Sequence, residues 1–263
     1  MIRTIGDLTL LLYVAAMAFA FLDGGFRRKA LHLLCLASAS AAFVLHAASL
    51  TAKWKESGVI PSVNAPQLME LTVFFLMLTY FVSGIFARQR EMLFFLTPIS
   101  VLLMMTAGML PQDLPETKPY FTTFWFPLHI FLIVSGMTLV LFSFIYSAIF
   151  IMQDHSLRKR KQPNALLLPP ISVTEKLSKF YLKTGFFFFS AGMLSSAAYG
   201  ILRSDGGGYR PGLLEAASFL SWIVLGAATF GWVRSGMRPR KRAFLVIVGS
   251  SLFLFIFMGM LWH

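Results

Sequence analysis

The stretch FWFPLHIFLIVSGMTLVLFSFIYSAIFIMQ, residues 124–153, contains no aspartate, glutamate, lysine or arginine. A helix of about 20 apolar residues is long enough to cross the hydrocarbon core of a bilayer. Lipid offers the backbone no hydrogen-bond partner, so a spanning segment must satisfy its own N–H and C=O groups, as a helix does. The stretch therefore predicts a transmembrane helix.

Further apolar runs of similar length fill most of the chain. With the quoted run, which extends over 122–152, they occupy 7–22, 30–50, 66–87, 91–110, 179–202, 213–233 and 243–262. Hydrophobic residues make up 57% of the sequence and charged residues only 13%, which is far more apolar than a soluble domain. We predict an all-α integral membrane protein, a bundle of about eight transmembrane helices that forms one polytopic domain over residues 1–263.

Basic residues gather in alternate connections between these runs. They cluster near residues 27–29, 88–90, 154–178 and 234–242, whereas the connections 51–65, 111–121 and 203–212 hold fewer of them. The positive-inside rule places the basic set in the cytoplasm, so both termini should face outward and 154–178 should be a basic cytoplasmic linker. The net charge of +12 then reflects topology and contact with anionic membrane lipid, not nucleic acid. We expect a multi-pass protein of the inner (cytoplasmic) membrane.

Three histidines fall in the outward half of the predicted bundle: His46, His129 and His263. An imidazole is costly in hydrocarbon unless it is paired or lines a cavity, so each of these positions is a candidate site. The neutral ring nitrogen is a good axial ligand for haem iron. Hydrogen bonding of each histidine to a neighbouring helix explains the same positions without a ligand, and the sequence leaves both interpretations open.

Two carboxylates, Glu70 and Glu215, each follow a proline in the first turn of a predicted inward-running helix. The positive end of the helix dipole stabilises a carboxylate there, so a structural role accounts for both and a functional one stays open. The sequence contains no H-E-x-x-H zinc motif, no phosphate-binding glycine loop and no nucleophile–base pair. We therefore assign no catalytic residue. Cys35 is the single cysteine, which excludes an intramolecular disulfide.

The segment HAASLTAKWKESGVIPSVN, residues 46–64, resembles the cytochrome c assembly family, the haem-handling membrane proteins of the CcsA and CcmC type and their HemX-like relatives. In that family a membrane histidine precedes a basic-aromatic pair, a Ser-Gly pair, a proline and an asparagine. The matching positions here are His46, Lys53, Trp54, Ser57, Gly58, Pro61 and Asn64. The stretch 124–153 resembles the W-x-x-x-H helix of the family, with Trp125 and His129 in the key places.

The chain departs from the cytochrome-assembling members at the tryptophan-rich motif of the family. The corresponding stretch, DGGGYRPGLLEAASFLSW, keeps Glu215 and Trp222 among its few matching residues. Phe230 stands where those members often have a second membrane histidine, and Gln67 replaces a glutamate, with Glu70 three residues later. The resemblance thus implies the family fold but argues against a full cytochrome c synthetase, and it favours the HemX-like branch.

The resemblance implies a haem-handling membrane protein that binds or passes haem b at the outer face for cytochrome c maturation. The implied cofactor-binding residues are His129, His263, His46, Trp125, Glu215 and Trp222. Of these, His129 and His263 are the candidate ligands of the haem iron, and His46 is a deeper third site or relay.

A second interpretation belongs to a different class of protein. In it the chain is a HemX-like regulator or membrane scaffold that controls a haem-biosynthesis enzyme through its basic loops and binds no haem. The partners implied by the two interpretations are haem, membrane lipid, and a cytochrome c assembly subunit or a haem-biosynthesis enzyme. Both favour binding, transfer or regulation over catalysis, although an enzymatic activity stays open.

Overall fold

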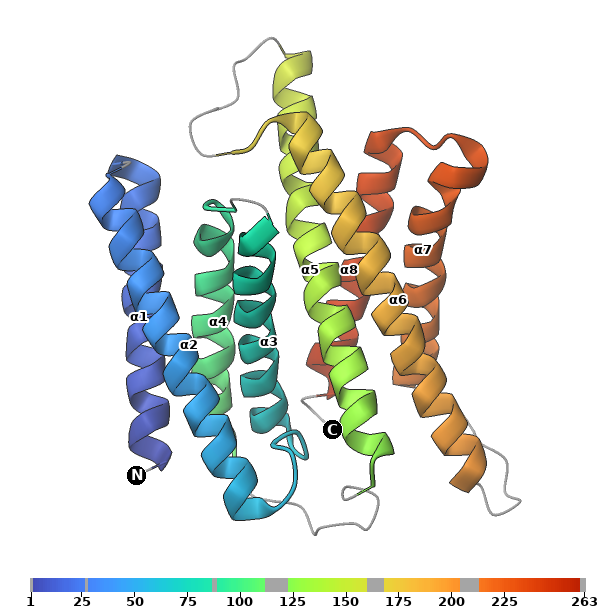
Figure 1. Cartoon of the computed structure of the whole chain (residues 1–263). Coiled ribbons are helices and arrows are strands. Elements are labelled where there is room, and N and C mark those ends of the chain that lie inside the picture. The colour runs from blue at the N-terminus through green and yellow to red at the C-terminus, as the bar shows by residue number, and fades with distance from the viewer. Residues whose placement is uncertain are drawn as a thin grey trace. The chain divides into compact units, whose positions relative to one another are not determined.

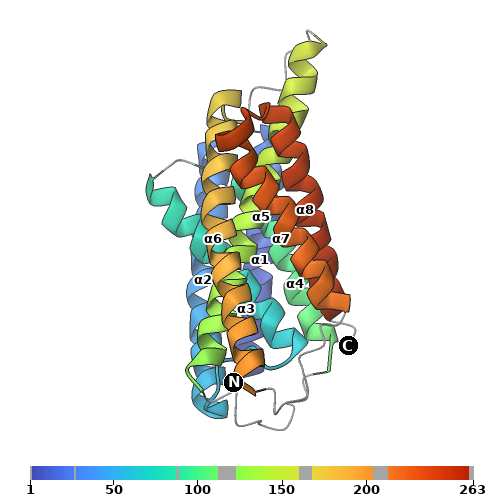
Figure 2. The same ribbon diagram turned by 90° about the vertical axis from the view of Figure 1, so that its right-hand side faces the viewer.

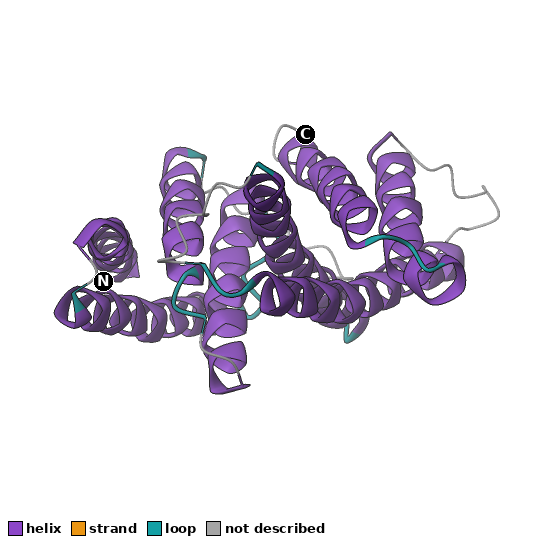
Figure 3. Ribbon diagram, turned by 90° about the horizontal axis from the view of Figure 1, so that it is seen from above, coloured by secondary structure: helices purple, strands orange, loops and turns teal. Residues whose placement is uncertain are grey.

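Every regular element in the described part of the chain is an α-helix (Figure 3). The computed structural model describes residues 2–26, 28–86, 89–111, 123–159, 168–203 and 213–260. The helices are α1 (Ile2–Phe26), α2 (Lys29–Ser57), α3 (Ala65–Phe86), α4 (Met92–Met109), α5 (Trp125–Arg158), α6 (Ile171–Arg203), α7 (Leu213–Ser235) and α8 (Pro239–Met260). The prediction of an all-helical membrane fold is confirmed.

Each predicted apolar run coincides with one helix, and most helices extend beyond the run. Five of them, α1 to α5, are long and apolar enough within the described residues to cross a membrane. The largest extensions are in α2, which continues to Ser57, and in α6, which begins at Ile171. These ends carry charged residues that the hydropathy pattern assigns to loops. The number of spans and the outward position of both termini stay predictions.

The helices divide into two compact units, residues 1–123 and 124–263. In the first unit α1 packs against α2 and α4, and α3 packs against α4 and α2 (Figure 1). Its two basic connections lie at the same end, because Arg90, before α4, donates two hydrogen bonds to the carboxylate of Asp23 near the end of α1. Asp23 is 5% exposed. This ion pair ties the α1–α2 connection to the α3–α4 connection.

The second unit is built around the antiparallel pair α5 and α6 (Figure 2). Their backbones approach closely at glycines: a Cβ atom added to Gly136 of α5 would lie 2.6 Å from the backbone nitrogen of Phe189 of α6. Small residues at a contact let transmembrane helices pack at short range. Ser143 and Ser147 of α5 add buried hydrogen bonds to Ser178 of α6, at 2.9 and 2.8 Å. These contacts fix the register of the pair.

Ion pairs also join the basic connections at one end of the second unit. Arg242 of α8 donates to Glu175 of α6 at 3.2 Å, and Arg240 lies 3.9 Å from Asp154 of α5. The predicted linker 154–178 overlaps helices at both ends, since α5 continues to Arg158 and α6 begins at Ile171. The description of the chain as one domain, with 154–178 as a linker, stays a prediction.

Candidate functional site

His46 lies inside the first unit, on the buried face of α2. This face consists of buried residues at helical spacing: Cys35, Ala39, Ala42, His46 and Ser49. The small side chains among them allow α1 to approach α2. The Tyr13 hydroxyl of α1 lies 3.3 Å from Nδ1 of His46. The Phe74 ring of α3 packs edge-on against the imidazole, with the two ring centres 6.0 Å apart. The histidine is 1% exposed.

The second ring nitrogen of His46, Nε2, is buried and has no hydrogen-bond partner among the described atoms. A buried polar atom without a partner costs about 1–3 kcal/mol. When Nδ1–H donates to the Tyr13 oxygen, Nε2 carries a lone pair and can bind a metal. When Tyr13 donates instead, Nε2 carries the proton and cannot. The direction of the hydrogen bond with Tyr13 and the tautomer of His46 are therefore coupled.

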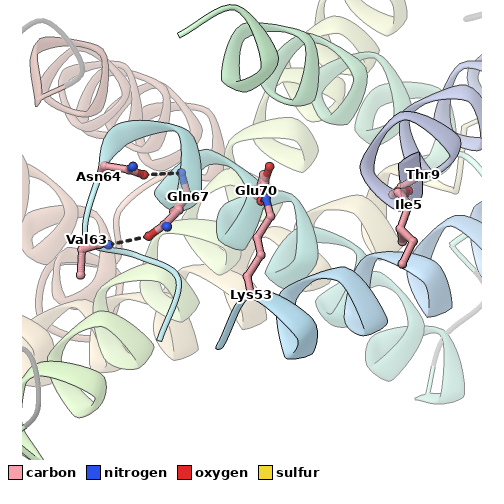
Figure 4. Close-up of polar contacts among 7 residues, drawn as sticks. All are labelled: Ile5, Thr9, Lys53, Val63, Asn64, Gln67 and Glu70. Atoms are coloured by element: carbon pink, nitrogen blue, oxygen red, sulfur yellow. Dashed lines mark hydrogen bonds and ion pairs between the residues drawn. The ribbon is translucent and has the colours of Figure 1, made fainter. Parts of the chain in front are cut away.

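The other residues of the 46–64 motif build the connection between α2 and α3. Gly58 ends α2 with φ at +70°, a left-handed conformation that glycine adopts without strain, and its N–H donates to the Trp54 carbonyl at 2.8 Å. Asn64 begins α3, where its Oδ1 accepts from the N–H of Gln67 at 3.0 Å. Gln67 Oε1 in turn accepts from the N–H of Val63 at 3.1 Å (Figure 4).

These contacts explain why Gln67 can replace the glutamate that the family motif has at this position, with Glu70 three residues later. Gln67 supplies the side-chain oxygen that reaches back over the start of α3, a role for which a charge is not needed. Glu70, one turn further, accepts a hydrogen bond of 2.5 Å from Lys53 Nζ of α2 (Figure 4). Both side chains are mostly buried, at 15% and 22% exposure. Both residues could be identified from the sequence but their pairing could not, because α2 extends about two turns beyond its apolar run.

His129 lies in the first turns of α5, against α6 of the same unit. Its Nδ1 is 3.0 Å from the Gly192 carbonyl oxygen and 3.1 Å from Ser195 Oγ. Gly192 allows the helices to approach closely here, since a Cβ atom at residue 192 would lie 2.6 Å from Cδ1 of Ile133 and 3.1 Å from the Ile133 backbone nitrogen of α5. A carbonyl oxygen only accepts, so Nδ1 carries the proton in the neutral ring and Nε2 carries the lone pair. This is the tautomer that a haem-iron ligand requires.

The two predicted tryptophans differ in their surroundings. Trp222 of α7 donates from Nε1 to Ser190 Oγ of α6 at 2.8 Å and stacks between Phe186 and Phe219, with ring centres 5.8 and 5.6 Å away. Trp125 begins α5 and is 48% exposed. Trp222 and His129 thus contact the same stretch of α6, residues 190–195, whereas Trp125 is one turn before His129 on α5.

Two predicted site residues fall outside what the structure describes. Glu215 lies in α7, but its side chain is outside the described part, and His263 lies beyond the described end of α8. The remaining four separate by unit: His46 belongs to the first, and His129, Trp125 and Trp222 belong to the second. Tyr13, Gly192 and Ser195 could not be identified from the sequence, since no motif marks the neighbours of a buried ring nitrogen.

Comparison with known proteins gives a family match over nearly the whole chain. The family model described as Cytochrome C assembly protein matches residues 3–263. No curated protein matches the chain. A solved structure, described as Cytochrome c Heme Lyase CcmF, matches 99% of this chain with a TM-score of 0.68 at 14% sequence identity. This chain covers 49% of the length of that protein, so it spans about half of it. At that identity the likeness shows a common fold.

Proposed function

This chain belongs to the cytochrome C assembly protein family, and from that premise we propose that it is a haem-handling protein of the inner membrane. It binds b-type haem without a covalent bond, near the outward ends of its helices, and holds or passes it for cytochrome c maturation. The positive-inside pattern of the sequence supports this sidedness. Bound haem supplies the iron centre, and the chain supplies ligation and an apolar setting.

The observation that carries the proposal is the hydrogen bond between His129 Nδ1 and the Gly192 carbonyl. It fixes the ring orientation and the tautomer in which Nε2 is basic, which is what an outer hydrogen bond does for a ligating histidine. His129 is half-buried, so its ring lies at the edge of the helix pair instead of inside it.

His46 fits the same chemistry in the first unit, because its buried Nε2 has no described partner. We assign it the role of a second haem contact or relay. His263 is proposed as the second iron ligand, with Trp125, Trp222 and Glu215 as residues near the macrocycle. These roles rest on the family motif and on the composition of the outward helix ends.

The proposal is tested by the absorption spectrum of the purified protein. We expect a Soret band whose height per protein falls several-fold in His129→Ala. His155→Ala is the matched control, because His155 lies on the same helix, is exposed and is near the opposite end of α5. A Soret band that is equally high in the wild type, His129→Ala and His263→Ala would refute iron ligation by these residues.

The regulatory interpretation remains the second candidate, and the exposed basic residues at the start of α8 favour it. Arg238, Arg240 and Lys241 are exposed there, Arg240 lies 3.9 Å from Asp154, and the sequence of 154–178 contains further cations. Such a surface suits an acidic partner protein. Under this interpretation the protein purifies without haem and with a haem-biosynthesis enzyme, and neutralising the charges of 154–178 releases that enzyme.

A further inference from the structure

Three basic residues crowd the first turn of α8, where the helix dipole is also positive. Arg240, Lys241 and Arg242 follow Pro239, the first residue of the helix. Cations are unfavourable at a helix N-terminus, because the unpaired N–H groups there carry partial positive charge. Arg240 and Arg242 meet carboxylates of α5 and α6, at 3.9 and 3.2 Å. The turn as a whole keeps an excess of positive charge, and an anion would relieve it.

Arg242 is the buried member of this turn, with 3% of its side chain exposed. Nη2 donates to Glu175 Oε1 at 3.2 Å, but Nε and Nη1 are buried without a hydrogen-bond partner among the described atoms. Nε carries one N–H and Nη1 carries two, so most of the donor fork of the guanidinium is unused. Guanidinium forks of this kind match the oxygen atoms of phosphate groups, often in pairs of parallel bonds.

Arg242 lines a small pocket between α6, α7 and α8, all in the second unit. Its lining includes Arg242, Lys179, Lys183 and Thr229, and its empty space is about 200 Å³ with the open mouth included. With the side chains as they stand, the enclosed part of that space holds only roughly one water. An anion enters when the two flexible lysine side chains move aside.

The charges around the pocket favour an anionic occupant. The carboxylate of Glu175 is shared by two cations, since its Oε1 is 2.7 Å from Lys179 Nζ and 3.2 Å from Arg242 Nη2. Lys179 and Arg242 thus share a single carboxylate between them. Asp154 lies at the same end of the unit but pairs with Arg158 and Arg240.

Exposed aromatic residues lie near these cations along the sequences of α6 and α8. Phe180 follows Lys179, Phe187 lies one turn beyond Lys183 on α6, and Phe244 lies just after Arg242 on α8; their exposures are 58%, 68% and 60%. A cation cluster at the end of an apolar helix surface matches a phospholipid, whose charged headgroup and acyl chains are joined in one molecule. A free phosphate ion would gain nothing from the aromatic residues.

We propose that Arg242, Lys179 and Lys183 form a phosphate-binding site at the predicted cytoplasmic ends of α6 and α8, occupied in the membrane by the headgroup of an anionic phospholipid. The lipid supplies oxygen acceptors for Nε and Nη1 of Arg242 and lays its chains along the exposed aromatic residues. It thereby holds α8 against α6. This site is separate from the proposed haem contacts, and its test does not depend on haem.

The test measures lipid binding to the purified full-length protein in neutral detergent by native mass spectrometry. The probes are dihexanoyl phosphatidylglycerol, dihexanoyl phosphatidylcholine and inorganic phosphate. Lys183→Gln is the main variant, and Lys176→Gln is its matched control, because both are exposed lysines of α6 and only Lys183 lines the pocket. Arg242→Lys keeps the charge and removes the fork.

We expect phosphatidylglycerol to bind more tightly than phosphatidylcholine, and Lys183→Gln to weaken it about fivefold, as expected for one basic residue near a lipid surface. Lys176→Gln should leave it unchanged, and Arg242→Lys should weaken it further. An equal loss of phosphatidylglycerol binding in Lys183→Gln and Lys176→Gln would show that general surface charge attracts the lipid, and would overturn the proposed site. Binding of inorganic phosphate without phosphatidylglycerol would overturn the lipid as the occupant. If Arg242→Lys fails to fold, the two lysine variants decide alone.

Discussion

The contact between α5 and α6 at Gly136 supplies a prediction with a defined sign. In Gly136→Ala the new Cβ atom lies 2.6 Å from the Phe189 nitrogen and 2.9 Å from its Cα, and backbone atoms cannot rotate away as a side chain can. The helices must separate by about 0.8 Å to reach ordinary contact at 3.4 Å. Overpacking of this kind costs about 1–3 kcal/mol, and the better helix propensity of alanine returns about 0.5–1 kcal/mol.

The expected net loss is therefore about 0–2.5 kcal/mol. Relative to an alanine substitution that meets no clash, the loss is the full cost of about 1–3 kcal/mol, a difference of a few degrees in Tm for a chain of this size. Thermal unfolding in detergent, followed by circular dichroism, measures it. Gly6→Ala is the control, because a Cβ atom at Gly6 meets nothing within 4 Å and only the propensity gain applies. The account of the helix contact is refuted if Gly136→Ala unfolds at the same temperature as Gly6→Ala or higher.

Three further predictions concern the charged and capped helix ends. Lys53→Met and Glu70→Gln should each destabilise the first unit. A double-mutant cycle should give a coupling energy of about 1–2 kcal/mol, a value between those of exposed and of fully buried ion pairs. A coupling energy of zero would contradict the 2.5 Å contact. Asn64→Ala should cost about 1 kcal/mol in thermal unfolding through loss of the α3 cap, and Asn64→Ser should restore most of it. Burial favours a higher pKa for Glu175, which precedes the predicted span, but hydrogen bonds from its lysine and arginine partners lower its pKa below 4.5. Its stabilising contribution is thus complete above pH 4.5 and disappears as pH falls through the lowered pKa, so the Tm difference between wild type and Glu175→Gln should shrink at low pH. A difference that grows instead would contradict the pairing.

The fold could be predicted from the sequence because lipid allows few alternatives. An apolar run such as 124–153 must form a helix, and its length alone fixes most of α5. The ends of the helices could not be predicted in the same way. Residues 51–57 and 171–178 are polar enough for a loop, yet they continue α2 and α6 because ion pairs and hydrogen bonds such as Lys53 to Glu70 fix them.

The 46–64 motif predicted the family, and the family model confirms it. The structure assigns much of that motif to the chain's own architecture, since Gly58 ends α2 and Asn64 begins α3. His46, the first residue of the motif, differs from them because its buried Nε2 has no described partner. A motif therefore indicates the fold through residues that need not touch the cofactor.

The neighbours of the candidate ligands could not be predicted because they come from other helices. Tyr13 reaches His46 from α1, and Gly192 reaches His129 from α6. Each contact depends on helix register, which hydropathy does not encode. Glycine at residue 192 is the one local signal, and it becomes meaningful only when the packing against Ile133 is known.

The most direct test of the central claim is chemical rescue of the proposed iron ligand. His129→Gly should lose most of the Soret absorbance of the purified protein, and added imidazole should restore it, because free imidazole can take the place of the missing ring. His155→Gly should keep its absorbance without imidazole. A His129→Gly protein with an undiminished Soret band, or one whose lost band imidazole does not restore, would contradict haem ligation by His129.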